Sequence, residues 1–191
     1  MGVMNDVQIT EYAANEHMIK PFALHTGNGV ISYGLSSFGY DMRLGPKLKV
    51  FGRGPSTAVP LIDPKNFNPD VVYDVEATDY YDLPPLTYAL GYSVEYFMMP
   101  RHTMGIVIGK STYARCGLMV NCTPMEAGWA GHLTIELFNA TFLPIRLYIG
   151  EGIAQAVFYY GHPPRVSYAD RRGKYQDQID EPITAKVLKG E

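Results

Sequence analysis

Short apolar runs alternate with turn-forming residues along most of this chain. The runs are rich in β-branched and aromatic side chains, and Gly, Pro, Asp or Asn residues bound them, as is typical of strands. The expected strand regions are residues 30–45 (strand, loop, strand), 48–52, 87–100, 104–109, 132–139, 145–150 and 153–160. Because no long helices separate them, the pattern predicts an all-β barrel or sandwich.

Helical patterns are few. Residues 6–19 carry a loose apolar stripe that Pro21 ends. A second, very short helix is expected after residues 104–109, with Ser111 as its N-cap and Gly117 just beyond its end. Residues 53–69 are rich in Pro, Asp and Asn and predict a long surface loop.

Length and composition predict one domain, residues 1–165, with a polar tail over residues 166–191. Of the 191 residues, 47% are hydrophobic, which is enough to build a core. The net charge of −3 gives no reason to expect nucleic-acid or membrane partners. We find no secretory or membrane-spanning run, and we expect a cytoplasmic protein in which Cys116 and Cys122 are free thiols.

The short helix joins groups that suit an anionic ligand. Ser111 and Arg115 are four residues apart and should share a face. Lys110 and the unpaired amides of the first turn offer positive charge to a phosphate. The alternative is a capped surface turn with solvated Lys110 and Arg115, and the pattern alone favours this alternative.

Residues 132–139 place a carboxylate in a strand. Alternation puts Leu133, Ile135 and Leu137 on one face. Glu136 lies on the other face, and a solvent-facing residue is the simplest interpretation. The functional alternative is a partly buried Glu136 with a raised pKa, which would transfer protons near neutral pH.

Two common nucleotide chemistries lack their motifs. The zinc nucleobase-deaminase pattern, H-x-E with P-C-x-x-C, does not occur, and the Cys and His residues have no spacing for zinc. A phosphate-binding P-loop is excluded because Met104 stands where its first Gly is required.

These residues resemble one family in detail. The block GKSTYARCGLMVNCTP, the GW that follows and TIELFN resemble the dCTP deaminase family. The resemblance extends from about residue 19 to residue 178 through ISYGLSSFGYDMRLG, IDPKNF, LPIRLYIGEGIAQAVFY and SYADRRGKYQDQ.

The resemblance implies a dUTPase-like distorted β-barrel (β-clip) with a few short helices. It implies a homotrimer with active sites at subunit boundaries. The implied reaction is hydrolysis of dCTP to dUTP and ammonia without a catalytic metal, with Mg²⁺ accompanying the triphosphate and no zinc. dUTP or dTTP is expected as a product or inhibitor ligand.

The same resemblance assigns site residues. Glu136 is the expected general base and acid, assisted by Ser111 and Arg115. The expected nucleotide contacts are Lys110, Ser111, Thr112, Tyr113, Ala114, Arg115, Thr134, Ile135, Glu136, Gln155, Tyr168, Lys174 and Gln178. The tail then becomes a lid over the nucleotide, whereas its polar composition alone equally allows a disordered end.

Two rival functions stay open. A dUTP diphosphatase, alone or combined with the deaminase, would need a carboxylate near the α-phosphate. Glu126 is the only candidate in its loop, and that loop is shorter here than in some family members. A non-catalytic nucleotide sensor on the same fold would not need Glu136 beside the base.

Overall fold

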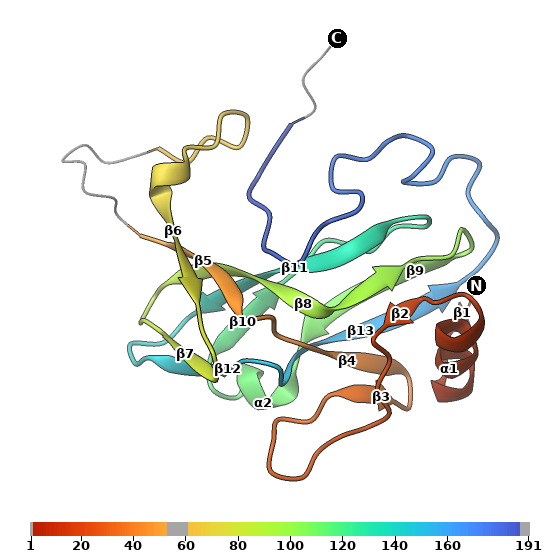
Figure 1. Ribbon diagram of the computed structural model, residues 1–191, viewed down its shortest axis with the longest axis horizontal. Helices are drawn as coiled ribbons and strands as arrows, with labels where there is room; N and C mark the ends of the chain where they lie inside the picture. Colours follow the sequence, from red (N-terminus) through yellow and green to blue (C-terminus); the bar gives the residue numbers. More distant parts are fainter. Residues whose placement is uncertain (1, 53–60, 188–191) are drawn as a thin grey trace.

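The computed structural model describes residues 2–52 and 61–187, and it shows a mainly β protein (Figure 1). The expected loop over residues 53–69 lies partly outside this range, at residues 53–60. The described helices are α1 (Asp6–Asn15), α2 (Ser111–Ala114) and the 3₁₀ helix η1 (Pro69–Val71). The mainly β fold class is therefore confirmed. No helix in the described part of the chain is long and apolar enough to cross a membrane.

Two antiparallel sheets and a separate two-stranded pair contain the strands. The first sheet has the order β1-β13-β4-β3, and β9 pairs with the other edge of β13. Its strands are β1 (Gly2–Val3), β3 (Gly34–Ser36), β4 (Gly39–Arg43), β9 (Thr103–Gly109) and β13 (Gly152–Tyr160).

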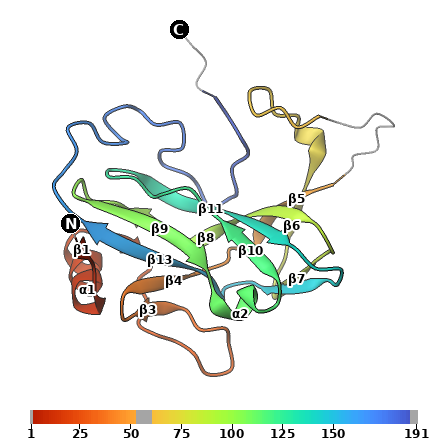
Figure 2. The ribbon, with the colours of Figure 1, turned by 180° about the vertical axis from the view of Figure 1, so that it is seen from behind.

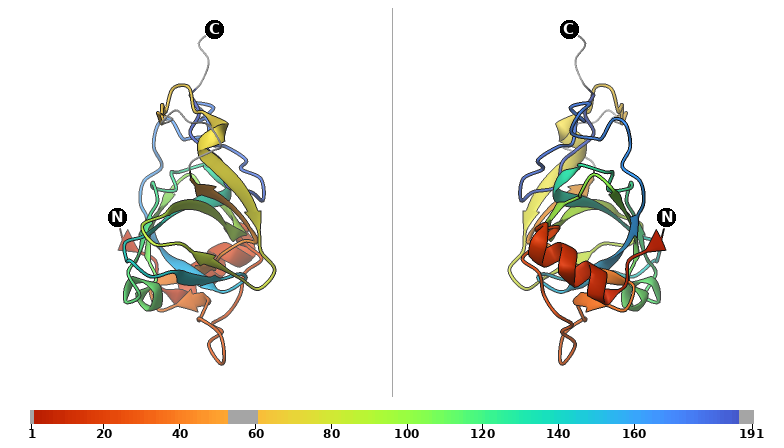
Figure 3. Two further views of the ribbon diagram at one scale, coloured as in Figure 1. Left: turned by 90° about the vertical axis from the view of Figure 1, so that its left-hand side faces the viewer. Right: turned by 90° about the vertical axis from the view of Figure 1, so that its right-hand side faces the viewer.

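The second sheet has the order β10-β11-β8-β5-β6, and β2 also pairs with β8. Its strands are β2 (Ile19–Lys20), β5 (Lys47–Phe51), β6 (Val72–Glu76), β8 (Tyr88–Met98), β10 (Leu118–Asn121) and β11 (Ala130–Asn139). A separate pair joins β7 (Tyr80–Leu83) to β12 (Ile145–Tyr148). The side views show the sheets curving around a shared interior, with α1 at one end (Figure 3).

The core lies between the two sheets. Phe97 of β8 and Phe158 of β13 are fully buried, and their ring centroids are 6.4 Å apart. Tyr40 of β4 is also fully buried. Burying each such side chain contributes roughly 1.5–3 kcal/mol, so the facing apolar surfaces of the two sheets hold the fold together.

Strand β11 shows the alternation that the sequence predicts. Leu133, Ile135 and Leu137 are buried in the core. Thr134 and Glu136 lie on the opposite face and are only partly buried. The strand therefore presents its polar side chains away from the core, toward the region occupied by the C-terminal tail.

Helix α1 is shorter than expected. It ends at Asn15 rather than at residue 19, and Ile19 belongs to β2, where it pairs with Phe97. The helix begins with a capping box between Asn5 and Gln8. The apolar stripe misled the prediction because Ile19 is buried by strand pairing rather than by a helix face.

The second helix begins one residue away from the expected position. Lys110 is the N-cap of α2 and provides no side-chain cap, whereas Ser111 was predicted for this role. Gly117 follows the helix with φ +85°, a conformation that favours glycine. The expected short helical turn after β9 is therefore confirmed, with its start displaced by one residue.

Candidate functional site

A cavity of about 1080 Å³ lies against the polar face of β11. Strands β8 and β11, the loop before β11 and the tail contribute its walls. The family-assigned residues that line it are Thr134, Glu136, Tyr168, Lys174 and Gln178, together with Glu126. Its aromatic lining consists of Phe51, Phe67, Tyr88, Trp129, Tyr168 and Tyr175. Aromatic walls with a few polar groups are typical of small-molecule sites.

Glu136 is the chemically distinctive group of this cavity. Its neighbours across the strands are Leu90 of β8 and Asn121 of β10. Burial raises the pKa of Glu136 to about 7, and hydrogen bonding to its own backbone amide and to the Cys122 thiol offsets this only in part. Among the described residues, the buried atom Oε2 has no hydrogen-bond partner. Glu136 is therefore partly buried with a raised pKa rather than solvent-facing, and its role in proton transfer stays a prediction.

The tail forms one wall of the cavity, and hydrogen bonds join it to β11 between residues 177 and 183. The indole Nε1 of Trp129 donates to the Tyr175 carbonyl at 2.7 Å. The Tyr168 amide donates to the Ala127 carbonyl at 2.9 Å. Figures 1 and 2 show this segment lying along β11. A disordered end is therefore wrong for residues 166–187.

Gln178 makes the most direct contact between the tail and β11. Its backbone carbonyl accepts from the His132 amide at 2.9 Å. Its side-chain Oε1 accepts from the Thr134 amide at 3.3 Å and from Thr134 Oγ1 at 3.2 Å. Two residues assigned to the nucleotide, Thr134 and Gln178, are therefore adjacent.

Charged groups stand at the same cavity. Lys174 lies over the Tyr175 ring, 5.0 Å from its centroid, and supplies a cation. Glu126 forms an ion pair with Arg171 of the tail. Both partners of this pair are about half exposed, so it contributes at most ~1 kcal/mol. Glu126 therefore joins the loop to the tail.

Helix α2 carries the other half of the expected chemistry. Arg115 Nη1 donates to the Ser111 backbone carbonyl at 3.1 Å, which places the guanidinium beside the first turn of α2. Both residues are exposed. Within the described residues of one chain, neither lines the cavity that contains Glu136. In Figures 1 and 2, α2 lies on the side of the molecule opposite the tail.

Lys110 differs from the sequence expectation. Its ammonium is buried and donates to Asp41 Oδ2 at 2.7 Å, so it is not a free phosphate cation. A buried charge requires such a partner. The pair attaches the start of α2 to β4.

Three further expected contacts have side chains directed elsewhere. Tyr113 is buried, and its hydroxyl accepts from the Tyr148 amide at 2.9 Å. Ile135 is fully buried in the core. The Gln155 side chain donates to Ser36 Oγ at 3.1 Å in the first sheet. Tyr113 and Ile135 can therefore meet a ligand only through the backbone.

Thr112 lines a second cavity of about 460 Å³, and Ala114 is exposed beside it on α2.

Sequence reasoning missed two titratable neighbours of Glu136. Tyr88 lines the cavity, and burial followed by the charge of Glu136 raises its pKa to about 12. Cys122 lies beside Glu136, and burial raises the pKa of its thiol well above the usual range. Both Cys122 and Cys116 are free, as expected. The pairing of β10 and β11 brings Cys122 to Glu136, so no local motif could have indicated it.

The family model described as dCTP deaminase-like matches residues 3–161. The chain belongs to this family, and the resemblance found in its sequence is confirmed.

Particular relatives match over nearly the whole chain. The dCTP deaminase of Roseiflexus castenholzii is 51% identical over 180 residues, which cover 93% of this chain and 96% of the relative. The dCTP deaminase of Campylobacter fetus subsp. fetus is 49% identical over 192 residues, which cover 99% and 100%.

A solved structure supports the fold. The 2′-deoxycytidine 5′-triphosphate deaminase of Agrobacterium tumefaciens superposes with a TM-score of 0.63 at 19% identity. The match covers 84% of this chain, which spans about half (48%) of that solved chain. At this identity, the similarity establishes the architecture alone.

Proposed function

We propose that this protein hydrolyses the cytosine amino group of dCTP and releases dUTP and ammonia. The observation that carries the proposal is Glu136, a partly buried carboxyl with a pKa of about 7 on the wall of a nucleotide-sized cavity. Membership of the dCTP deaminase-like family supports the choice of substrate.

In the proposed reaction, Glu136 first acts as a base. It accepts a proton from water as the water oxygen bonds to C4 of the cytosine, and it passes this proton to N3. Glu136 then takes the proton of the new C4 hydroxyl and delivers it to the amino group. The C–N bond breaks, and ammonia leaves. Such proton transfer contributes about 10²–10⁴-fold to the rate.

Ser111 and Arg115 complete this site from a second subunit in our proposal. One chain presents them on the side opposite its own cavity, so an assembly must bring the two regions together. The proposed assembly is a homotrimer with a site at each subunit boundary. There Ser111 and the Pro124 carbonyl orient the attacking water, and Arg115 stabilises the developing charge. Pro124 already lines the cavity.

The phosphates are proposed to bind the tail and the backbone around α2. Lys174 is the cavity cation that supports this placement, with Gln178 and Tyr168 beside it. Charge-assisted hydrogen bonds of this kind are stronger than neutral ones. The described residues contain no cluster of three His, Cys, Asp or Glu side chains placed to hold a metal. Within residues 2–52 and 61–187 there is thus no dedicated Mg²⁺ cage, and no step above depends on one.

The test is product analysis with purified protein. Incubation with dCTP should give ammonia and dUTP in equal amounts. Formation of dUMP and pyrophosphate would add the diphosphatase activity, for which Glu126 is the carboxylate to substitute. Tight dCTP binding without ammonia would instead establish a nucleotide sensor.

A further inference from the structure

Strands β8 and β11 lose their regular pairing beside the cavity. His132 pairs with Tyr96 and Thr134 pairs with Tyr92, so residues 93–95 of β8 face Leu133 alone. This bulge removes the β8 carbonyl that would normally accept from the Leu133 amide. A buried amide without a partner is costly, so another acceptor must replace the carbonyl.

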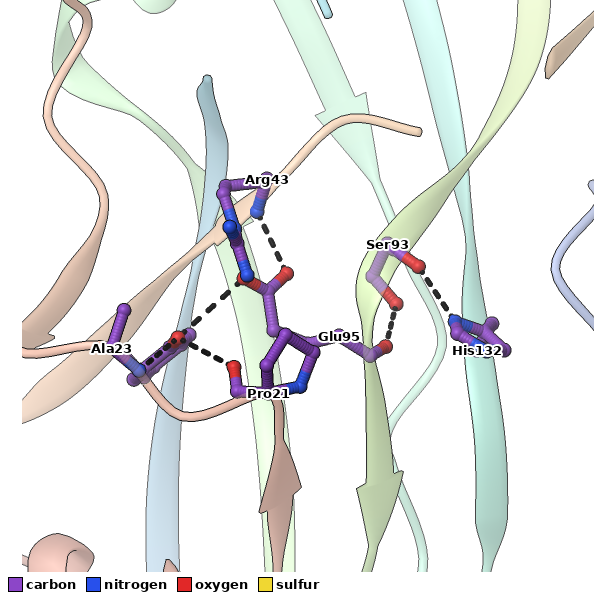
Figure 4. Close-up of polar contacts among 7 residues, drawn as sticks. Pro21, Ala23, Arg43, Ser93, Glu95 and His132 are labelled. Atoms are coloured by element: carbon purple, nitrogen blue, oxygen red, sulfur yellow. Dashed lines mark hydrogen bonds and ion pairs between the residues drawn. The ribbon is translucent and has the colours of Figure 1, made fainter. Parts of the chain in front are cut away.

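Ser93 supplies the replacement. Its side chain is fully buried, and its Oγ accepts from the Leu133 amide at 2.8 Å. The same hydroxyl donates to the Glu95 carbonyl at 2.6 Å. The Ser93 carbonyl also meets His132 Nδ1 at 2.9 Å, and Figure 4 shows these groups together. The Ser93 hydroxyl therefore makes two hydrogen bonds at the bulge, one within β8 and one from β8 to β11.

The bulge is also anchored to the first sheet. Arg43 of β4 donates to Glu95 through its Nε at 2.7 Å and through its backbone amide at 2.9 Å (Figure 4). The Glu95 carboxylate is completely buried. Residues 93–95 are thus bonded to β4 through Glu95 and to β11 through Ser93. The Ser93 hydrogen bond therefore fixes β11 relative to the first sheet.

The opposite edge of β11 receives the tail at the same place. Successive strand amides point to alternate edges, so the Leu133 amide points to β8 while those of its neighbours point outward. The outward amides of His132 and Thr134 both donate to Gln178. The position of Leu133 therefore sets the position of the two amides that hold the tail.

We propose that Ser93 is a positioning residue of the nucleotide site: by fixing β11 at Leu133, it aligns the strand edge on which Gln178 docks. Docking of Gln178 places the tail, and with it Lys174, at the cavity. What the docked tail binds rests on the proposed function, whereas the docking itself does not.

Trp129 provides a readout of docking that is independent of activity. It is the only tryptophan of the chain, and its indole donates to the tail carbonyl of Tyr175. Loss of tail docking should expose the indole, shift its fluorescence to longer wavelength and increase its quenching by acrylamide. The same proteins can be assayed for ammonia release from dCTP.

The experiment compares Ser93→Ala with Ser93→Thr, which retains the hydroxyl. Ser93→Ala should expose Trp129 and raise KM for dCTP about tenfold, the effect of losing one well-placed hydrogen bond. Its kcat should change far less, because Glu136 lies beyond the bulge, where pairing with Leu90 is regular. Ser93→Thr should restore both readouts.

Thr103→Val is unsuitable as a control, because Thr103 bonds Pro100 beside the loop that carries Trp129. Thr10→Val is the control instead. It removes a hydroxyl of α1 that donates to the Asp6 carbonyl at 2.8 Å, away from β11, and should change neither readout.

In a Gln178→Ala background, Ser93→Ala should add little to KM, because both changes act on one contact. If Ser93→Ala does not fold, Ser93→Cys replaces the hydroxyl with a weaker acceptor and should move both readouts in the same direction.

Two outcomes overturn the proposal. One is a lower melting temperature in Ser93→Ala or Ser93→Cys with unchanged Trp129 fluorescence and KM, which would make Ser93 a folding residue only. The other is an undiminished effect of Ser93→Ala in the Gln178→Ala background. If the wild-type protein releases no ammonia from dCTP, the proposed function fails, and the fluorescence of Trp129 still decides the role of Ser93.

Discussion

The cavity wall on β11 and the short helix α2 differ in how far one chain completes them. On β11, Glu136 has buried surroundings, a shifted pKa and a docked tail beside it. On α2, Ser111 and Arg115 are exposed, and neither is among the described residues that line the cavity. A single chain therefore forms the pocket around Glu136, whereas our proposal needs a second subunit to bring Ser111 and Arg115 to it. This division is what the proposed trimer explains.

The largest expected effect comes from removing the proposed proton carrier. Glu136→Gln keeps the shape of the side chain but cannot accept a proton, so deamination should fall by about 10²–10⁴-fold. Binding of dCTP, measured by calorimetry, should persist. Near-normal turnover in this variant would move the chemistry away from β11.

The second test asks whether the two regions meet across subunits. Arg115→Ala and Glu136→Gln should each be nearly inactive alone. When the two variants are unfolded together and refolded as mixed trimers, about a quarter of the sites should pair an intact Glu136 with an intact Arg115. Ammonia release should then recover to about that fraction of the wild-type rate. If both groups act within one chain, mixing will restore nothing, and two Glu136→Gln samples refolded together serve as the control.

The third test concerns the tail. Lys174→Ala removes a cation from the cavity and should raise KM for dCTP about tenfold, in line with the loss of a charge-assisted hydrogen bond. Lys186→Ala is a suitable control, because Lys186 also lies near the Tyr175 ring, at 5.3 Å, but does not line the cavity. Equal effects of the two changes would indicate a general electrostatic contribution.

The fourth test uses pH. Because burial raises the pKa of Glu136 to about 7, the ionised base disappears as the pH falls below this value. The kcat/KM for dCTP should decrease below pH 7, approaching tenfold for each pH unit. A profile that stays flat down to pH 5 would contradict the role of Glu136 as the base.

The smallest effect concerns stability. The pKa of Glu136 is higher in the folded chain than its ordinary 4.5, so folding favours the protonated form. The wild-type protein should lose this stabilisation as the pH rises from about 4.5 through 7. Above pH 7, Glu136→Gln should therefore melt at a higher temperature than wild type, because it buries no charge. The melting temperature should rise by about 2–4 °C for each kcal/mol by which the substitution increases the free energy of unfolding. The difference should vanish below pH 4.5, as thermal melts at several pH values will show.

Much of the fold follows from local patterns. Alternation along residues 132–139 identified both faces of β11, and the turn at Gly117 located the end of α2. The end of α1 and the start of α2 could not be predicted as well from the sequence. Strand pairing of Ile19 determines the first, and the buried ion pair of Lys110 determines the second. Both interactions join residues distant in sequence, and no local propensity records them.

The candidate site divides in the same way. The sequence alone determined that a carboxylate, a hydroxyl and a guanidinium stand at Glu136, Ser111 and Arg115, since residue types and spacing are local properties. Only the tertiary structure decided that Glu136 is buried enough to titrate near neutrality, because desolvation depends on everything packed around a group. It also decided that Lys110 is neutralised by Asp41 and that the tail docks on β11, since both contacts form only when the strands are in register.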